Sequence, residues 1–154
     1  MLSGPALWKV ITGGEIDIME KANYGTLTQH STHSNYTIHT HPSRQDQPNS
    51  GYGNCNPGVY NIYSVSLTEE AVTFYINNVE VFRYNNIEHS VNDPGYDRLL
   101  DIEKEYYLLN YTHIDCNYRI LIDIAINGAY PGKQAIPEEL PGIFDIDWIS
   151  VKKL

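Results

Sequence analysis

The sequence predicts an all-β fold, a sandwich or jelly roll of short antiparallel strands. Apolar and polar residues alternate with a period of two along much of the chain, and no stretch holds a helical stripe of apolar residues for three turns. Tyr, Asn, Thr and Gly are frequent, with 13 tyrosines among 154 residues, and these residue types are typical of strands and the turns between them. Seven alternating segments separated by turns favour two packed sheets.

The predicted strands follow one another along the chain at residues 15–20, 25–37, 58–67, 71–76, 79–84, 118–126 and 142–152. Asn77 and Asn78 form a two-residue connection that tolerates positive φ, so residues 71–84 predict a β-hairpin. Residues 41–57 are rich in Pro, Ser, Asn, Gln and Gly and lack periodicity, which predicts a long surface loop. Residues 85–116 predict an irregular or insertion-like segment, with a short helix within residues 97–109 as the alternative.

Length and charge narrow the classes of function. At 154 residues the chain has the size of one domain, so we expect a single domain over residues 1–154. A formal charge of −9 argues against binding to nucleic acid or to an anionic membrane surface. No apolar run approaches the ~20 residues of a membrane-spanning helix, and the N-terminus lacks the basic-then-apolar layout of a secretory signal. Cys55 and Cys116 lie in unrelated contexts and are expected to be unpaired thiols.

The most informative segment is the acidic strand at residues 13–20, GGEIDIME. In a strand, alternate side chains share a face, so Glu15 and Asp17 point together while strict alternation sends Glu20 to the other face. A β-bulge at Ile18 and Met19 adds one residue and returns Glu20 to the face of the other two acids. Three clustered carboxylates repel one another, which indicates a function or a metal site. A solvated acidic face on an ordinary strand is the competing interpretation.

Two carboxyl groups on one face suit the hydrolysis of a glycosidic bond with retention. That reaction needs the two groups ~5–5.5 Å apart, one to attack the anomeric carbon and one to protonate the leaving oxygen. The bulge and the twist of the strand can bring Glu15 and Glu20 close to this spacing. Asp17 between them can hydrogen-bond its neighbours and help hold their pKa values apart.

The segment GEIDIME resembles the active-site signature Glu-x-Asp-x-x-Glu of glycoside hydrolase family 16, found in laminarinases and related β-glucanases. The resemblance implies that Glu15 is the nucleophile, Glu20 the general acid/base and Asp17 an assisting acid. It also implies that His33 faces the substrate cleft and that Trp8 offers an aromatic surface to a sugar ring. Further similar segments follow in the family's order, with a gap at about residues 85–116: PALW at 5–8, QHSTHSNYT at 29–37, VTFYINN at 72–78, IDIAINGAYPG at 122–132 and FDIDWISV at 144–151.

The resemblance implies a concanavalin A-like jelly roll of two antiparallel sheets and a retaining endo-β-glucanase. Its substrate would be an internal β-1,3 or mixed β-1,3/1,4 linkage of a β-glucan, with galactans such as agar or carrageenan left open. We expect an extracellular or secreted monomer without a cofactor, although a sandwich of this kind can hold a structural calcium ion. The motif His39-x-His41 lacks a third ligand at a recognisable spacing, so no transition-metal site is expected.

The sequence also departs from the family pattern. Val10, Ile11 and Thr12 stand where the family commonly has a Trp-Pro pair, so another residue has to supply that aromatic surface. The family's N-terminal strands normally precede PALW, and this chain begins four residues before it, so we expect a partial, N-terminally truncated domain. The alternative function is therefore an inactive or truncated carbohydrate-binding remnant of a jelly roll.

Overall fold

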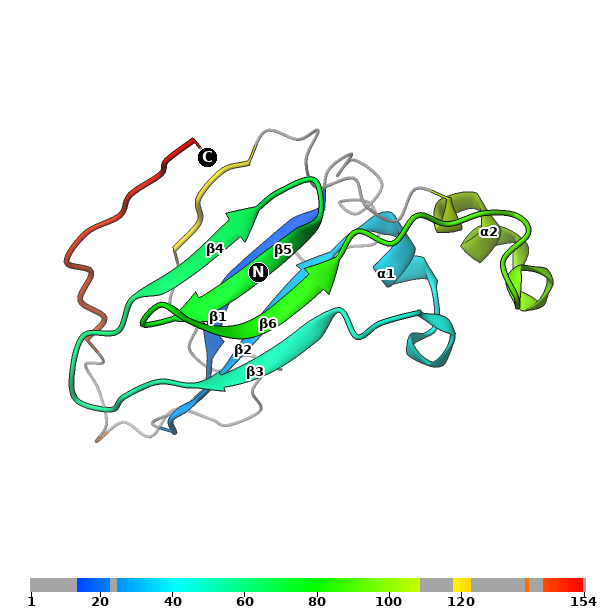
Figure 1. Cartoon of the computed structure of the whole chain (residues 1–154). Helices are drawn as coiled ribbons and strands as arrows, with labels where there is room; N and C mark the ends of the chain where they lie inside the picture. Colours follow the sequence, from blue (N-terminus) through cyan, green and yellow to red (C-terminus); the bar gives the residue numbers. More distant parts are fainter. Residues whose placement is uncertain (1–13, 23–24, 109–117, 123–137, 139–142, 154) are drawn as a thin grey trace. The chain divides into compact units, whose positions relative to one another are not determined.

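The computed structural model describes residues 14–22, 25–108, 118–122, 138 and 143–153. The chain divides into two compact units, Met1–Tyr118 and Arg119–Leu154. The first unit contains all the strands and helices described below (Figure 1). In the second unit, residues 119–122 and 143–153 belong to no strand or helix.

Six strands in the described part of the chain form two antiparallel sheets of three strands each. The first sheet has the order β1-β2-β3, with β1 at Glu15–Lys21, β2 at Leu27–His33 and β3 at Ser50–Asn54. The second sheet has the order β4-β5-β6, with β4 at Tyr63–Leu67, β5 at Ala71–Ile76 and β6 at Val79–Asn85 (Figure 1). The predicted all-β class of two antiparallel sheets is confirmed at this level.

The core lies between the two sheets and is built on β5 and β6. Val72, Phe74 and Tyr84 are fully buried, and Ile16 packs against them from the first sheet. On β3, a Cβ at Gly51 would lie 2.5 Å from the Phe82 ring. Because a side chain there would collide with the second sheet, glycine is what lets β3 come this close.

The hairpin between β5 and β6 confirms the turn predicted from the sequence. Asn77 and Asn78 have φ values of 51° and 66°, as a two-residue turn of the primed type requires. The backbone N–H of Asn77 donates to the Ile62 carbonyl at 2.8 Å, and the side-chain oxygen of Asn77 accepts from the backbone N–H of Ile62 at 2.9 Å. The turn is thereby tied to the segment that leads into β4.

The strand predicted at residues 25–37 is too long. β2 ends at His33, and a short helix, α1 at Asn35–His39, follows it. Ser34 caps this helix: its hydroxyl accepts from the Thr37 N–H at 3.3 Å, while the Thr37 hydroxyl accepts from the Ser34 N–H at 2.8 Å. This reciprocal pair is a capping box, and it outweighs the β-propensity of the segment.

The predicted loop at residues 41–57 contains a 3₁₀ turn, η2 at Pro42–Arg44, and the strand β3. No alternation marks β3 because its inward positions are Gly51 and Gly53, which carry no apolar side chain. The next predicted strand, at residues 58–67, is shorter than expected and begins at Tyr63.

The two strands predicted near the C-terminus are wrong where the structure describes them. Residues 118–122 and 143–152 belong to no strand, and residues 123–126 and 142 lie outside the described part of the chain. Trp148, placed in the core by its alternation with Ile146, is 59% exposed. Alternation shows which face a strand would bury, but it does not supply the hydrogen-bonding partner that a sheet needs.

A small helical cluster completes the first unit. It contains α1, a 3₁₀ turn η3 at Tyr96–Arg98 and the helix α2 at Asp101–Tyr107. The segment predicted to be irregular thus holds a helix, at the place of the alternative within residues 97–109. Tyr36, Leu99 and Tyr107 form the core of the cluster.

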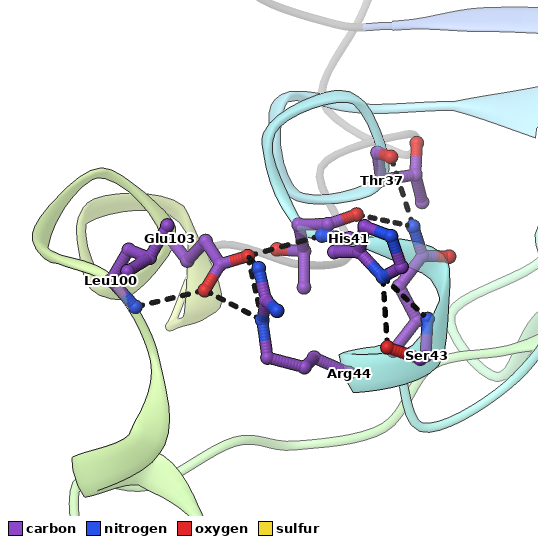
Figure 2. A network of polar contacts seen from close by, with 8 residues as sticks. Thr37, His41, Ser43, Arg44, Leu100 and Glu103 are labelled. Atoms are coloured by element: carbon purple, nitrogen blue, oxygen red, sulfur yellow. Dashed lines mark hydrogen bonds and ion pairs between the residues drawn. The ribbon is translucent and has the colours of Figure 1, made fainter.

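The buried carboxylate of Glu103 ties α2 to the segment after α1 (Figure 2). It accepts from the backbone N–H of His41 at 3.1 Å and of Leu100 at 2.8 Å, and it pairs with the Arg44 guanidinium, whose Nε lies 2.9 Å from Oε1. The Arg44 contact and the two backbone donors lower the pKa of Glu103 to about 2.

Candidate active site on the face of the first sheet

A β-bulge interrupts the pairing of β1 with β2. Asp17 pairs with Ser31 and Glu20 pairs with Gln29, so Ile18 and Met19 together face the single residue His30. The bulge predicted from the spacing of the acids is therefore confirmed at the predicted residues. The three acids of β1 lie opposite alternate residues of β2, so they share one face of the sheet, as predicted. Glu15 lies opposite His33, Asp17 opposite Ser31, and Glu20 opposite Gln29.

Asp17 is the centre of a polar cluster on this face. Its Oδ2 accepts from the hydroxyl of the buried Ser31 at 2.9 Å, and it lies 3.2 Å from Nε2 of His33. The same Ser31 hydroxyl lies 3.3 Å from Oε2 of Glu20. Asp17 also shares a hydrogen bond with Glu15. Asp17 and Ser31 together therefore connect both glutamates and His33.

Both glutamates hold their protons to higher pH than a free glutamate. Burial raises the pKa of Glu15, and the negative charge of Asp17 and its hydrogen bond raise it further. Burial and the charge of Asp17 likewise raise the pKa of Glu20, against the hydrogen bond from Ser31, which lowers it. The sequence predicts that Asp17 holds the pKa values of Glu15 and Glu20 apart. In the structure both pKa values are raised, and only Glu20 accepts a hydrogen bond from Ser31 that lowers its pKa.

His33 supplies positive charge to this acidic face. Its hydrogen bond with Asp17 raises the pKa of its imidazole, and the charges of all three acids raise it further, against a lowering by burial. In turn, the imidazolium lowers the pKa values of Glu15 and Glu20. The structure therefore places His33 beside the predicted catalytic acids.

A row of side chains extends from Glu20 across the sheet. Glu20 pairs with Gln29 on β2, and Gln29 pairs with Tyr52 on β3. Because Gly51 and Gly53 face the second sheet, Tyr52 points to the opposite face, which is the face of the acids, and it is 57% exposed. This face thus offers carboxylates, an amide and an aromatic ring.

Sequence reasoning did not single out Ser31 or Tyr52. Ser31 could have been found, because it lies two residues before His33 and alternation places both on one face. Tyr52 could not, because it lies in a segment that predicts a loop. Trp8, the other predicted substrate-binding residue, lies outside the described residues. Cys55 is a buried free thiol, and Cys116 is outside the described part as well.

Among the described residues, no group of three or more His, Cys, Asp or Glu side chains could hold a metal ion. A structural calcium ion stays a prediction. Within the same residues, no helix has the length and apolar character needed to cross a membrane.

No protein-family model matches the chain, and no curated protein sequence matches it. The resemblance to glycoside hydrolase family 16 therefore stays a prediction.

Proposed function

We propose that this protein is a retaining endo-β-glucanase that cleaves internal β-1,3 or mixed β-1,3/1,4 linkages. The observation that carries the proposal is the bulge at Ile18 and Met19, which returns Glu20 to the face of Glu15 and Asp17. Without that extra residue the two glutamates would lie on opposite faces of the sheet and could not act on one bond.

The proposed reaction is a double displacement. The Glu15 carboxylate attacks the anomeric carbon while Glu20 gives its proton to the departing glycosidic oxygen, which breaks the bond and leaves a glycosyl ester on Glu15. Glu20, now ionised, then takes a proton from a water molecule, and the resulting hydroxide attacks the anomeric carbon. The ester bond breaks, Glu15 leaves as a carboxylate, and the sugar keeps its original anomeric configuration.

The electrostatics suit the acid role of Glu20, whereas the two roles themselves rest on the resemblance, since the pKa of Glu15 is raised as well. Glu20 has to hold a proton near neutral pH, and burial together with Asp17 raises its pKa in that direction. Glu15 has to be ionised to attack; the positive charge of His33 favours its ionised form, against burial and the charge of Asp17, which raise its pKa. Asp17 is connected to both glutamates, directly to Glu15 and through the Ser31 hydroxyl to Glu20.

A neutral polysaccharide suits a chain with a charge of −9, because its hydroxyl groups bring no charge to repel the acids. Tyr52 offers an aromatic surface to a sugar ring, which the chain needs because Val10, Ile11 and Thr12 stand where the family commonly has a Trp-Pro pair. A concanavalin A-like jelly roll, a monomeric state and a secreted location belong to the same proposal, because they rest on the same resemblance.

Release of reducing ends from laminarin and from barley β-glucan tests the proposal, with Glu15→Gln and Glu20→Gln as controls. We expect cleavage by the wild-type chain, loss of activity in both variants, and a product that first appears as the β-anomer by proton NMR. Azide separates the roles: with Glu15→Ala it yields the α-glycosyl azide, and with Glu20→Ala the β-glycosyl azide. No cleavage of either glucan, or equal cleavage by Glu15→Gln, refutes the enzyme.

Binding of laminarin without cleavage would favour the alternative, a carbohydrate-binding remnant. Isothermal titration calorimetry of the wild-type chain and of Tyr52→Ala distinguishes this outcome from a protein that does not recognise glucans. If neither glucan binds or is cut, both functions are excluded.

A further inference from the structure

His30 is the residue of β2 that lies opposite the two bulge residues of β1. Its side chain is fully buried and points toward the second sheet, away from the acids. Its Nδ1 lies 2.7 Å from the carbonyl oxygen of Ile18, the first residue of the bulge. A bulge interrupts the hydrogen-bonded ladder, so a side chain that satisfies its backbone carbonyl stabilises the bulged conformation.

The contacts of the imidazole fix its orientation and its tautomer. Because a carbonyl can only accept, Nδ1 carries the proton in the bond to Ile18. On the other side of the ring, Nε2 lies 3.1 Å from the Thr28 hydroxyl, and the ring packs against Phe74 with centroids 5.8 Å apart. Burial lowers the pKa of His30, against the hydrogen bond to the Ile18 carbonyl, which raises it, so the neutral ring is favoured.

We propose that His30 is a positioning residue of the active site, which sets the placement of Glu20 by holding the Ile18 carbonyl. This inference rests on the proposed function for its consequence in catalysis. His30 cannot touch a substrate on the acidic face, because it lies on the opposite face of β2, where it pairs with Gly51 of β3. It acts instead on the backbone immediately before Glu20, and a displacement of about 1 Å at a catalytic group can cost roughly 100-fold in rate.

Two substitutions at this position separate the hydrogen bond from the bulk of the ring. His30→Leu keeps a buried side chain but removes the donor to Ile18, whereas His30→Asn keeps an N–H donor near the place of Nδ1. Thr32→Val is the matched control, because Thr32 is buried on the same face of β2 and its hydroxyl has no hydrogen-bond partner within the described structure. The thermal midpoint and near-ultraviolet circular dichroism report whether each variant folds.

For His30→Leu we expect kcat on laminarin to fall roughly 100-fold while KM changes less than about threefold. His30→Asn and Thr32→Val should stay within about fivefold of the wild-type kcat. A purely structural role of His30 would lower the thermal midpoint of His30→Leu without this selective loss of kcat. A folded His30→Leu variant with wild-type kcat overturns the inference.

A second measurement does not depend on activity. The pKa of Glu20, followed by carbon-13 NMR of its carboxyl group, is raised in the wild-type chain by burial and by Asp17. We expect it to move toward its ordinary value of 4.5 in His30→Leu, and to stay raised in His30→Asn. If the pKa shifts in this way but the wild-type chain cuts no glucan, the proposed function fails and the role of His30 at the bulge stands. If His30→Leu does not fold, loss of the raised Glu20 pKa in a folded His30→Asn variant overturns the inference.

Discussion

Replacing Glu103 with Gln tests the polar network of Figure 2, which connects α2 to the segment after α1. Glu103 accepts from two backbone N–H groups, those of His41 and Leu100, one on each carboxylate oxygen. Gln has a single oxygen, so its amide nitrogen must meet one of these donors and leave it unpaired. A buried donor without a partner costs about 1–3 kcal/mol, and a hydrogen bond to a charged group contributes about 1.5–3 kcal/mol.

We take about 3 kcal/mol as the combined effect, because Arg44 is 36% exposed and water can replace part of its contact with Glu103. In a chain of this length that corresponds to a decrease of roughly 6–12 °C in the thermal midpoint. Urea unfolding followed by circular dichroism measures the change in free energy. Glu105→Gln is the matched control, because Glu105 is an exposed residue on the same helix.

The effect should also depend on pH in a defined direction. The pKa of Glu103 falls from 4.5 to about 2 on folding, so its charge stabilises the folded state above pH 4.5 and that contribution is lost as the pH falls from 4.5 through about 2. The difference in stability between wild type and Glu103→Gln should therefore be constant from pH 7 to 5 and shrink at pH 3. Ordinary surface substitutions change the free energy of unfolding by up to about 0.5 kcal/mol. If Glu103→Gln and Glu105→Gln differ by no more than this at pH 7, the network is not a source of stability.

Three further predictions concern the acidic face. Burial and Asp17 raise the pKa of Glu15, so its charge destabilises the folded state above pH 4.5. Glu15→Gln should therefore increase the free energy of unfolding at pH 7, whereas Glu80→Gln, on β6 and outside the acidic cluster, should not; equal urea midpoints for Glu15→Gln and wild type would contradict this. Tyr52→Ala should raise KM for laminarin several-fold while Tyr52→Phe does not, and Tyr60→Ala, an exposed loop tyrosine, is the control. His33→Gln removes a positive charge that lowers the pKa of Glu15, so the acid limb of the kcat/KM profile should shift to higher pH; an unchanged limb would argue against their coupling.

Local patterns were sufficient for several elements. The Asn77-Asn78 turn was predictable because its backbone geometry depends on two residues that tolerate positive φ. The bulge was predictable because three acids spaced over six residues share a face only if one residue is added between the second and the third. In both cases the signal lies within a few neighbouring residues.

Other elements depend on partners that are distant in the sequence. β3 forms because glycines allow it to approach Phe82 of the second sheet, and no alternation marks such a strand. The predicted strand at residues 118–126 shows the reverse case, since its described residues, 118–122, are rich in the residue types of a strand and yet belong to none. Helix α1 is different, because its signal is local: a cap formed by Ser34 and Thr37 satisfies the backbone and interrupts another predicted strand.

The sequence by itself determined the all-β class, the hairpin turn and the face shared by Glu15, Asp17 and Glu20, because these follow from the twofold period of a strand and from the chemistry of single turns. Only the tertiary structure decided what surrounds the acids: the Ser31 hydroxyl between Asp17 and Glu20, Tyr52 at the end of the row, and His30 beneath the bulge. Those contacts join different strands, and they depend on the pairing register between the strands, which the sequence does not state.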